Sequence, residues 1–219
     1  MKSLVVLRCL PVTVMAIFLS ACSSDHGAPS TNYKPADYTV VGKVEKGPFV
    51  NGSLINMQPY NNEMKLSGKS YNARITDNEG TFLFDTEKLE TPIAEMAATG
   101  YYFNELKGQL SEGTLMLQSL VDVSMKKTVN VNILTHLMYP RIKYLMSEGA
   151  SFEEANNKAR NELYAAFGLQ QYVSQDPSQL SITLGTDGAG VLIAVSSLML
   201  RTRSDAEVTE YLAKLSKDF

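Results

Sequence analysis

The chain has 219 residues, 44% of them hydrophobic, and a formal net charge of −3. This length and apolar content allow a substantial core in one or two domains. The slightly acidic balance argues against a nucleic-acid partner, because nucleic-acid-binding domains carry a strongly basic face. The only two cysteines are Cys9 and Cys22. The chain beyond Cys22 therefore contains no thiol for a disulfide or a cysteine metal site.

Residues 1–21 are predicted to be an export signal. Lys2 and Arg8 supply positive charge, and residues 12–19 form an apolar run without an acidic residue. A membrane-spanning helix needs about 20 apolar residues, so this run is too short to remain as a permanent span.

The segment Leu19-Ser20-Ala21-Cys22 closes this leader. It resembles the lipobox of bacterial lipoproteins. The resemblance implies cleavage before Cys22, acylation of its sulfur and, with Ser23 next, delivery to the outer membrane. A cysteine thiolate is the nucleophile that accepts a diacylglyceryl group, and two or three acyl chains anchor a protein stably. The membrane is thus the first expected partner. The alternative is an ordinary secretory signal in which the cysteine occurs by chance.

Residues 22–37 are predicted to be a flexible tether. Small and polar residues dominate this stretch, and Pro29 and Pro35 interrupt it. Such a composition buries too little apolar surface to offset the entropy cost of ordering the chain. The tether would hold the folded part away from the membrane.

Residues 38–123 are predicted to form an antiparallel β-sandwich. Apolar and polar residues alternate with a period of two, which is typical of strands buried on one face. Phe82 and Phe84 are predicted to point into the core. In the turn Asp77-Asn78-Glu79-Gly80, Asp77 is expected to accept backbone hydrogen bonds and Gly80 to adopt a positive φ. The predicted strands are 38–45, 53–57, 71–76, 81–85, 93–99 and 114–123.

Three motifs of this region resemble the carboxypeptidase regulatory-like domain, a transthyretin-like sandwich. They are Val41-Gly42-Lys43-Val44, Asn51-Gly52-Ser53-Leu54-Ile55 and the segment 76–82. The second motif departs from the usual pattern at Ser53 and Leu54. The resemblance implies a fold and an accessory role without catalytic residues, because these motifs specify turns rather than chemistry.

The run Tyr101-Tyr102-Phe103 is the candidate binding site. In an extended segment alternate side chains point to opposite faces, so at least one ring should be exposed or packed on a neighbouring unit. One interpretation is a stacking platform for a sugar or a partner. The other is a plug at a domain interface, in which the tyrosine hydroxyls form local hydrogen bonds.

Residues 128–219 are predicted to form a small helical domain, which makes the fold class α+β. Four helices are expected, with Asn132 as a candidate N-cap of the first. Capping boxes beginning at Ser151 and Ser204 precede two of the others. The chain stops at Phe219 directly after a predicted helix, without a glycine or proline stop signal. This ending leaves open that the chain is a truncated form of a longer protein.

From the sequence we predict no catalytic, cofactor-binding or metal-binding residue. No G-x-S-x-G nucleophile motif occurs. His26 lies in the tether, and helical periodicity places His136 on the solvent-facing stripe of its helix, as a surface histidine.

The order of a lipobox, a sandwich and helices resembles that of bacterial envelope lipoproteins. The favoured function is a lipid-anchored, non-enzymatic module that binds or braces another envelope protein or a glycan. The alternative is an envelope enzyme, or an enzyme accessory, acting on glycan or cell-wall substrates through His136 or buried acids. An exposed ring in 101–103 favours binding, whereas His136 in a pocket with a hydrogen-bonded partner and a shifted pKa favours an enzyme.

Overall fold

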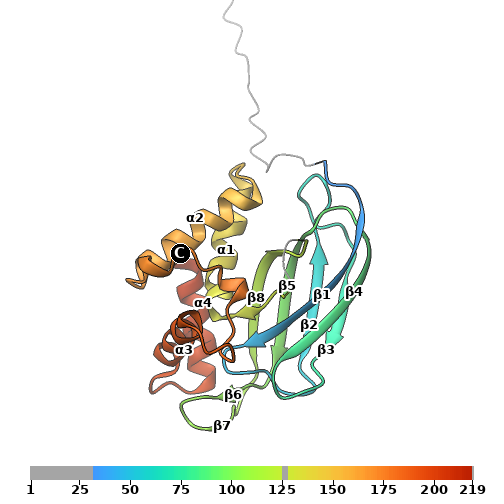
Figure 1. Cartoon of the computed structure of the whole chain (residues 1–219). Coiled ribbons are helices and arrows are strands. Elements are labelled where there is room, and N and C mark those ends of the chain that lie inside the picture. Colours follow the sequence, from blue (N-terminus) through green and yellow to red (C-terminus); the bar gives the residue numbers. More distant parts are fainter. Residues whose placement is uncertain (1–31, 125–127, 219) are drawn as a thin grey trace, which may run out of the picture.

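The computed structural model describes residues 32–124 and 128–218. Within these ranges the fold is α+β, as predicted, with antiparallel sheets followed by four helices. The strands form one side of the molecule and the helices pack along the other (Figure 1). None of the helices in the described ranges is long and apolar enough to cross a membrane.

Two main sheets form the β-region. Their strand orders are β4-β1-β9 and β3-β2-β5-β8, and a third, two-stranded sheet is the β6–β7 hairpin. All six predicted strands are present, whereas β6, β7 and β9 were not predicted. The bounds are Ala36–Glu45 (β1), Leu54–Pro59 (β2), Tyr71–Arg74 (β3), Thr81–Leu89 (β4), Ile93–Gly100 (β5), Phe103–Asn104 (β6), Gln109–Leu110 (β7), Leu115–Asp122 (β8) and Val131–Asn132 (β9).

Alternate residues of the strands face a shared core, as the period of two predicted. Phe82 and Phe84 are both buried, with ring centroids 5.6 Å apart. Ile55 and Met57 of β2 are buried as well. The buried side chains of both sheets and of the helices belong to one continuous hydrophobic core.

The turn before β4 forms as predicted. Asp77 Oδ1 accepts hydrogen bonds from the backbone N–H groups of Glu79 (2.9 Å) and Thr81 (3.1 Å). Gly80 has a φ of 78°. A Cβ at this position would also lie 2.4 Å from the carbonyl oxygen of Val44, so both the backbone conformation and the space favour glycine.

The segment expected to be helical begins with a strand. β9 pairs in parallel with β1, with Val131 opposite Val44. Just before it, the Val129 N–H donates to the carbonyl oxygen of Val41 over 2.8 Å. This approach requires Gly42, because a Cβ there would lie 1.9 Å from the carbonyl oxygen of Val129.

Three of the four helices begin where the capping residues predicted, and α3 begins after Thr186, an N-cap that was not predicted. Asn132 Oδ1 accepts from the N–H groups at 134 and 135, and capping boxes form at Ser151 and Ser204. α1 packs against β8, α2, α3 and α4, and is the central helix. The bounds are Ile133–Ser147 (α1), Phe152–Ala166 (α2), Asp187–Leu200 (α3) and Asp205–Asp218 (α4), with short 3₁₀ helices η1 (Gln170–Tyr172) and η2 (Pro177–Gln179) between α2 and α3.

Candidate functional site

The three aromatic residues between β5 and the hairpin divide between surface and core. Tyr101 and Phe103 are 45% and 43% exposed, whereas Tyr102 is 1% exposed. This alternation is that of an extended chain. Tyr102 is therefore wrong as a candidate ligand-binding residue, because its ring is enclosed, and only Tyr101 and Phe103 are open to a partner.

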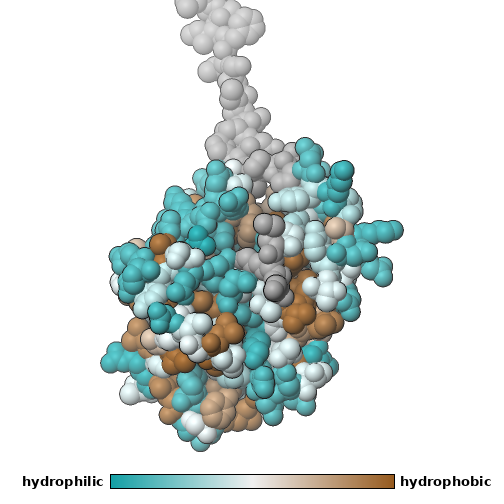
Figure 2. Space-filling model, viewed as in Figure 1, coloured by the Kyte–Doolittle hydropathy of each residue, from teal (hydrophilic) through white to brown (hydrophobic). Residues whose placement is uncertain are grey.

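The exposed rings are part of a larger apolar area on the β6–β7 hairpin. Leu106 and Leu110 are each about half exposed. We call Tyr101, Phe103, Leu106 and Leu110 the hairpin surface. Phe103 and Leu110 also line an open hollow of about 490 Å³, whose other lining residues are Pro48, Val50 and Asn78. Figure 2 shows apolar side chains gathered at the end of the molecule where the hairpin and α3 lie.

The hairpin loop is held by a buried asparagine. Asn104 Oδ1 accepts hydrogen bonds from the N–H groups of Leu106 (3.2 Å) and Lys107 (3.1 Å). The Gly108 N–H donates to the Asn104 carbonyl oxygen over 2.8 Å. The apolar tip is thus presented on an ordered loop.

Beneath the exposed rings, Tyr102 joins the hairpin to the last helix. Its hydroxyl donates to Asp205 Oδ1 over 2.6 Å. Asp205 Oδ2 accepts from the N–H groups of Glu112 (2.6 Å) and Gly113 (3.3 Å). Burial alone would raise the pKa of Asp205, but these hydrogen bonds outweigh it and hold the pKa below its usual value.

A buried ion pair joins the hairpin to the residue after β1, and Ser196 of α3 contacts both partners. The Lys46 side chain is fully buried, and its Nζ lies 3.1 Å from Glu105 Oε2 and 4.7 Å from the centre of the Tyr102 ring. The Ser196 hydroxyl donates to the Lys46 carbonyl oxygen over 2.5 Å and also lies against Glu105 Oε1. Burial lowers the pKa of Lys46 to about 8, although Glu105 opposes the shift. Because Lys46 and Ser196 are enclosed, this cluster positions the hairpin rather than contacting a ligand.

The prediction that His136 lies on the solvent stripe is wrong. His136 is half-buried between α1 and β8, and its Nδ1 accepts a hydrogen bond from the Gln118 N–H over 3.1 Å. β8 is an edge strand of its sheet, so this N–H has no strand partner on that side. Burial lowers the pKa of His136 to about 4, which keeps the ring neutral. Helical periodicity placed Lys143 correctly on the exposed side of α1. It could not indicate that β8 covers the first turn of the helix, where His136 lies.

A second polar cluster, centred on Glu95, was not predicted. Tyr60 donates to Glu95 Oε1 over 2.5 Å and Tyr139 to Oε2 over 2.6 Å, while Lys143 Nζ lies 2.8 Å from Oε1. Burial raises the pKa of Glu95, but the hydrogen bonds from Lys143 and the tyrosines outweigh it and lower the pKa. The carboxylate is therefore held ionised, which suits a structural anion and not a proton donor.

The Glu95 cluster borders a surface hollow of about 250 Å³, which Tyr60 and Lys143 line together with Met64 and Met146. Ser147 also lines the hollow, and its hydroxyl donates to the Tyr144 carbonyl oxygen over 2.7 Å. Tyr60, Glu95 and Tyr139 come from distant parts of the chain, so no sequence motif could have identified the cluster.

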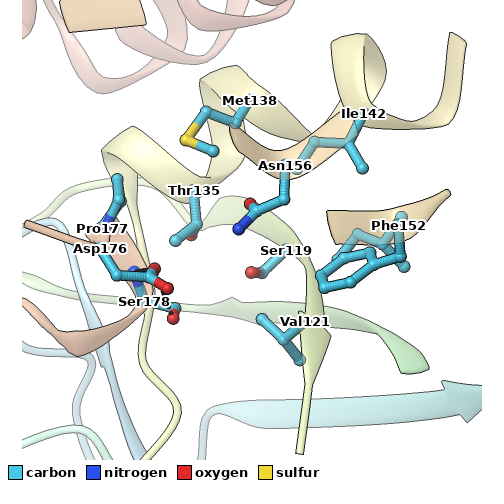
Figure 3. Close-up of a pocket in the computed structure, with 11 residues that line it drawn as sticks. Ser119, Val121, Thr135, Met138, Ile142, Phe152, Asn156, Asp176, Pro177 and Ser178 are labelled. Atoms are coloured by element: carbon cyan, nitrogen blue, oxygen red, sulfur yellow. Dashed lines mark hydrogen bonds between the residues drawn. The ribbon is translucent and has the colours of Figure 1, made fainter. Parts of the chain in front are cut away.

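A small cavity lies between β8, α1, α2 and η2 (Figure 3). Ser119, Thr135 and Asn156 point into it. Ser119 Oγ is buried and has no hydrogen-bond partner among the described residues. The cavity volume is about 10 Å³, enough for one water molecule but not for a substrate.

Acylation and metal binding would take place outside these clusters. Cys22 lies outside the described residues, so its acylation stays a prediction. Within residues 32–124 and 128–218, no group of three or more His, Cys, Asp or Glu side chains is arranged to hold a metal ion.

Comparison with known proteins identifies no relative: no family model, curated protein or solved structure matches this chain.

Proposed function

We propose that the protein is a lipid-anchored, non-enzymatic module of the bacterial cell envelope that binds another envelope protein through the hairpin surface. The main support for this proposal is the exposed apolar hairpin surface. Four large apolar side chains are exposed together on a short hairpin, and buried polar contacts at Asn104, Tyr102 and Lys46 hold that hairpin in place. Clustered exposed apolar side chains mark interaction sites more often than isolated ones do.

The composition of the surface favours a protein partner over a glycan. Tyr101 and Phe103 offer rings on which a sugar could stack. Their neighbours, however, are Leu106 and Leu110, with Pro48 and Val50 in the adjoining hollow. Aliphatic side chains give no hydrogen bonds to sugar hydroxyls, whereas they pack well against an apolar segment of a protein.

The position of the hairpin fits a partner that lies away from the anchoring membrane. The described chain begins at one end of the molecule, and the β6–β7 hairpin lies at the opposite end (Figure 1). A protein anchored through Cys22 would therefore present the hairpin surface outward.

The alternative is an envelope enzyme, or an accessory to one, that acts on glycan or cell-wall substrates. His136 favours it in part, because the ring has a hydrogen-bonded partner and a lowered pKa. Against it, His136 lines none of the hollows described above, and its Nδ1 is occupied by a backbone N–H. The hydrogen bond from Gln118 instead gives His136 a role in holding α1 against β8.

A pull-down from envelope extract tests the proposal. The full chain should retain a specific protein, and the double variant Phe103→Ser, Leu110→Ser should lose it. Leu83→Ser is the matched control, because Leu83 is about half exposed but lies on β4. The same samples are applied to a glycan array. Glycan binding without a retained protein would exclude the protein partner, and hydrolysed glycan that disappears in His136→Ala would establish the enzyme instead.

A further inference from the structure

One face of α3 is apolar and exposed. The helix contains a single charged residue, Asp187. Its inward side is buried in the core through Val191, Leu192, Val195 and Met199. On the outward side Ile193 and Leu198 are 43% and 46% exposed. A helix that is apolar on all sides is normally covered on all sides, so this outward face lacks a partner among residues 32–124 and 128–218 of the single chain.

The outward face follows a regular spacing. Asp187, Gly190, Ala194, Ser197 and Arg201 succeed one another at intervals of three, four, three and four residues. This spacing keeps the first four on one line along α3, as in the contact seam of a coiled coil, and Arg201, the C-cap residue with a φ of 37°, follows at the end of that line. Ile193 and Leu198 flank the line on its two sides. Together these seven residues form what we call the α3 face.

We propose that the α3 face packs against the same face of a second copy of this chain, with the two helices antiparallel about a two-fold axis at Ala194. Asp187 lies seven residues before Ala194, and Arg201 lies seven residues after it. The two-fold axis therefore places Asp187 of each copy opposite Arg201 of the other, and opposite charges meet at both ends of the contact.

The individual side chains suit this arrangement. Asp187 and Arg201 are both exposed, and neither forms an ion pair with another described residue of its own chain. Gly190 and Leu198 lie four residues to either side of Ala194. Each leucine therefore faces the glycine of the other copy, where no Cβ obstructs it; a Cβ at Gly190 would itself meet no atom within 4 Å.

The expected contact is small. One pair of four-turn helices buries less surface than the roughly 1,200 Å² or more of a stable interface, so the dimer should be weak in dilute solution. Anchoring through Cys22, which belongs to the proposed function, would confine both copies to one membrane and raise their effective concentration. The α3 face and the hairpin surface consist of different residues, so self-association and partner binding can be tested separately.

Disulfide trapping in native membranes tests the proposed axis. The full chain with Ala194→Cys is oxidised with copper phenanthroline. It should yield a covalent dimer, because residue 194 of each copy lies at the two-fold axis. Glu153→Cys is the control, because Glu153 is exposed on α2, away from the α3 face. A dimer yield from Ala194→Cys no higher than that from Glu153→Cys would overturn the proposal.

A charge exchange tests the antiparallel register in the same Ala194→Cys background. Asp187→Arg and Arg201→Asp each replace two attractive contacts by two repulsive ones, so each should lower the rate of dimer formation by roughly tenfold. The double variant restores opposite charges and should recover most of the original rate. Far-UV circular dichroism verifies that the helices are retained. A double variant as slow as the single variants would contradict the register.

Discussion

The hydroxyl of Tyr102 donates a 2.6 Å hydrogen bond to Asp205, which lies 103 positions later in the chain. Asp205 is the first residue of α4, and its other carboxylate oxygen accepts from the backbone at 112 and 113, just after β7. One carboxylate thus connects the last helix to both ends of the hairpin. The exposed rings of Tyr101 and Phe103 therefore depend on α4 for their position, although α4 does not carry them.

We expect Tyr102→Phe to lower the free energy of unfolding by about 1.5–3 kcal/mol, because it removes a hydrogen bond to a charged group. Urea denaturation measures this change. Tyr101→Phe is the matched control: the same hydroxyl is lost from an exposed neighbour, and the effect should stay within about 0.5 kcal/mol. Equal effects of the two variants would show that the Tyr102–Asp205 bond does not stabilise the fold.

Features specified by local sequence were predictable. The alternation at Phe82 and Phe84 identifies a strand and its buried face without knowledge of what it packs against. Asp77 and Gly80 likewise mark a turn, because Asp77 accepts hydrogen bonds from residues a few positions later and Gly80 adopts a positive φ. The N-caps of the helices belong to the same class, because the capping side chain and the N–H groups it accepts from are neighbours in sequence.

Features that depend on distant contacts were not predictable. β9 has only two residues, and it is a strand because Gly42 admits the backbone at Val129 next to β1. The environment of His136 is set by the free edge of β8, which helical periodicity cannot indicate. The burial of Lys46 likewise depends on a distant contact, because its partner Glu105 comes from the hairpin.

Replacement of Phe82 by alanine should cost roughly 3 kcal/mol or more, because a fully buried ring leaves a cavity in the core. The midpoint of urea denaturation should fall accordingly. The adjacent residue provides the control, since Leu83 is about half exposed on the other face of β4 and Leu83→Ala should change stability little. Unchanged melting of Phe82→Ala would mean that the strand face is assigned incorrectly.

His136 should make the protein sensitive to mild acid. The folded-state pKa is lowered to about 4 from 6.5, so between these pH values the unfolded chain binds more protons than the folded one. The free energy of unfolding therefore falls as pH decreases through this window, by at most ~3 kcal/mol from this residue. His136→Asn retains a hydrogen-bond acceptor but does not titrate, so it should lose this part of the pH dependence. Urea denaturation at pH 7 and pH 4.5 compares the two, and the same pH dependence in both would exclude His136 as its source.

The anchor prediction concerns Cys22. The mature protein should begin at Cys22 with acyl chains attached and should sediment with membranes. Cys22→Ser should leave the chain unprocessed or release it into the soluble fraction, because the acyl acceptor is lost. Mass spectrometry of the mature N-terminus decides the question. An unmodified terminus at any other residue would show that the leader is an ordinary secretory signal.

Site-specific photo-cross-linking in intact cells tests whether the hairpin surface binds another envelope protein. A benzophenone amino acid replaces Phe103 in one variant and Leu83 in the other, since both positions are exposed but only the first lies on the hairpin surface. We expect a discrete cross-linked protein from position 103 that is absent from position 83 and is lost when Leu110→Ser is added. No cross-linked protein at position 103, or the same product from both positions, would contradict it.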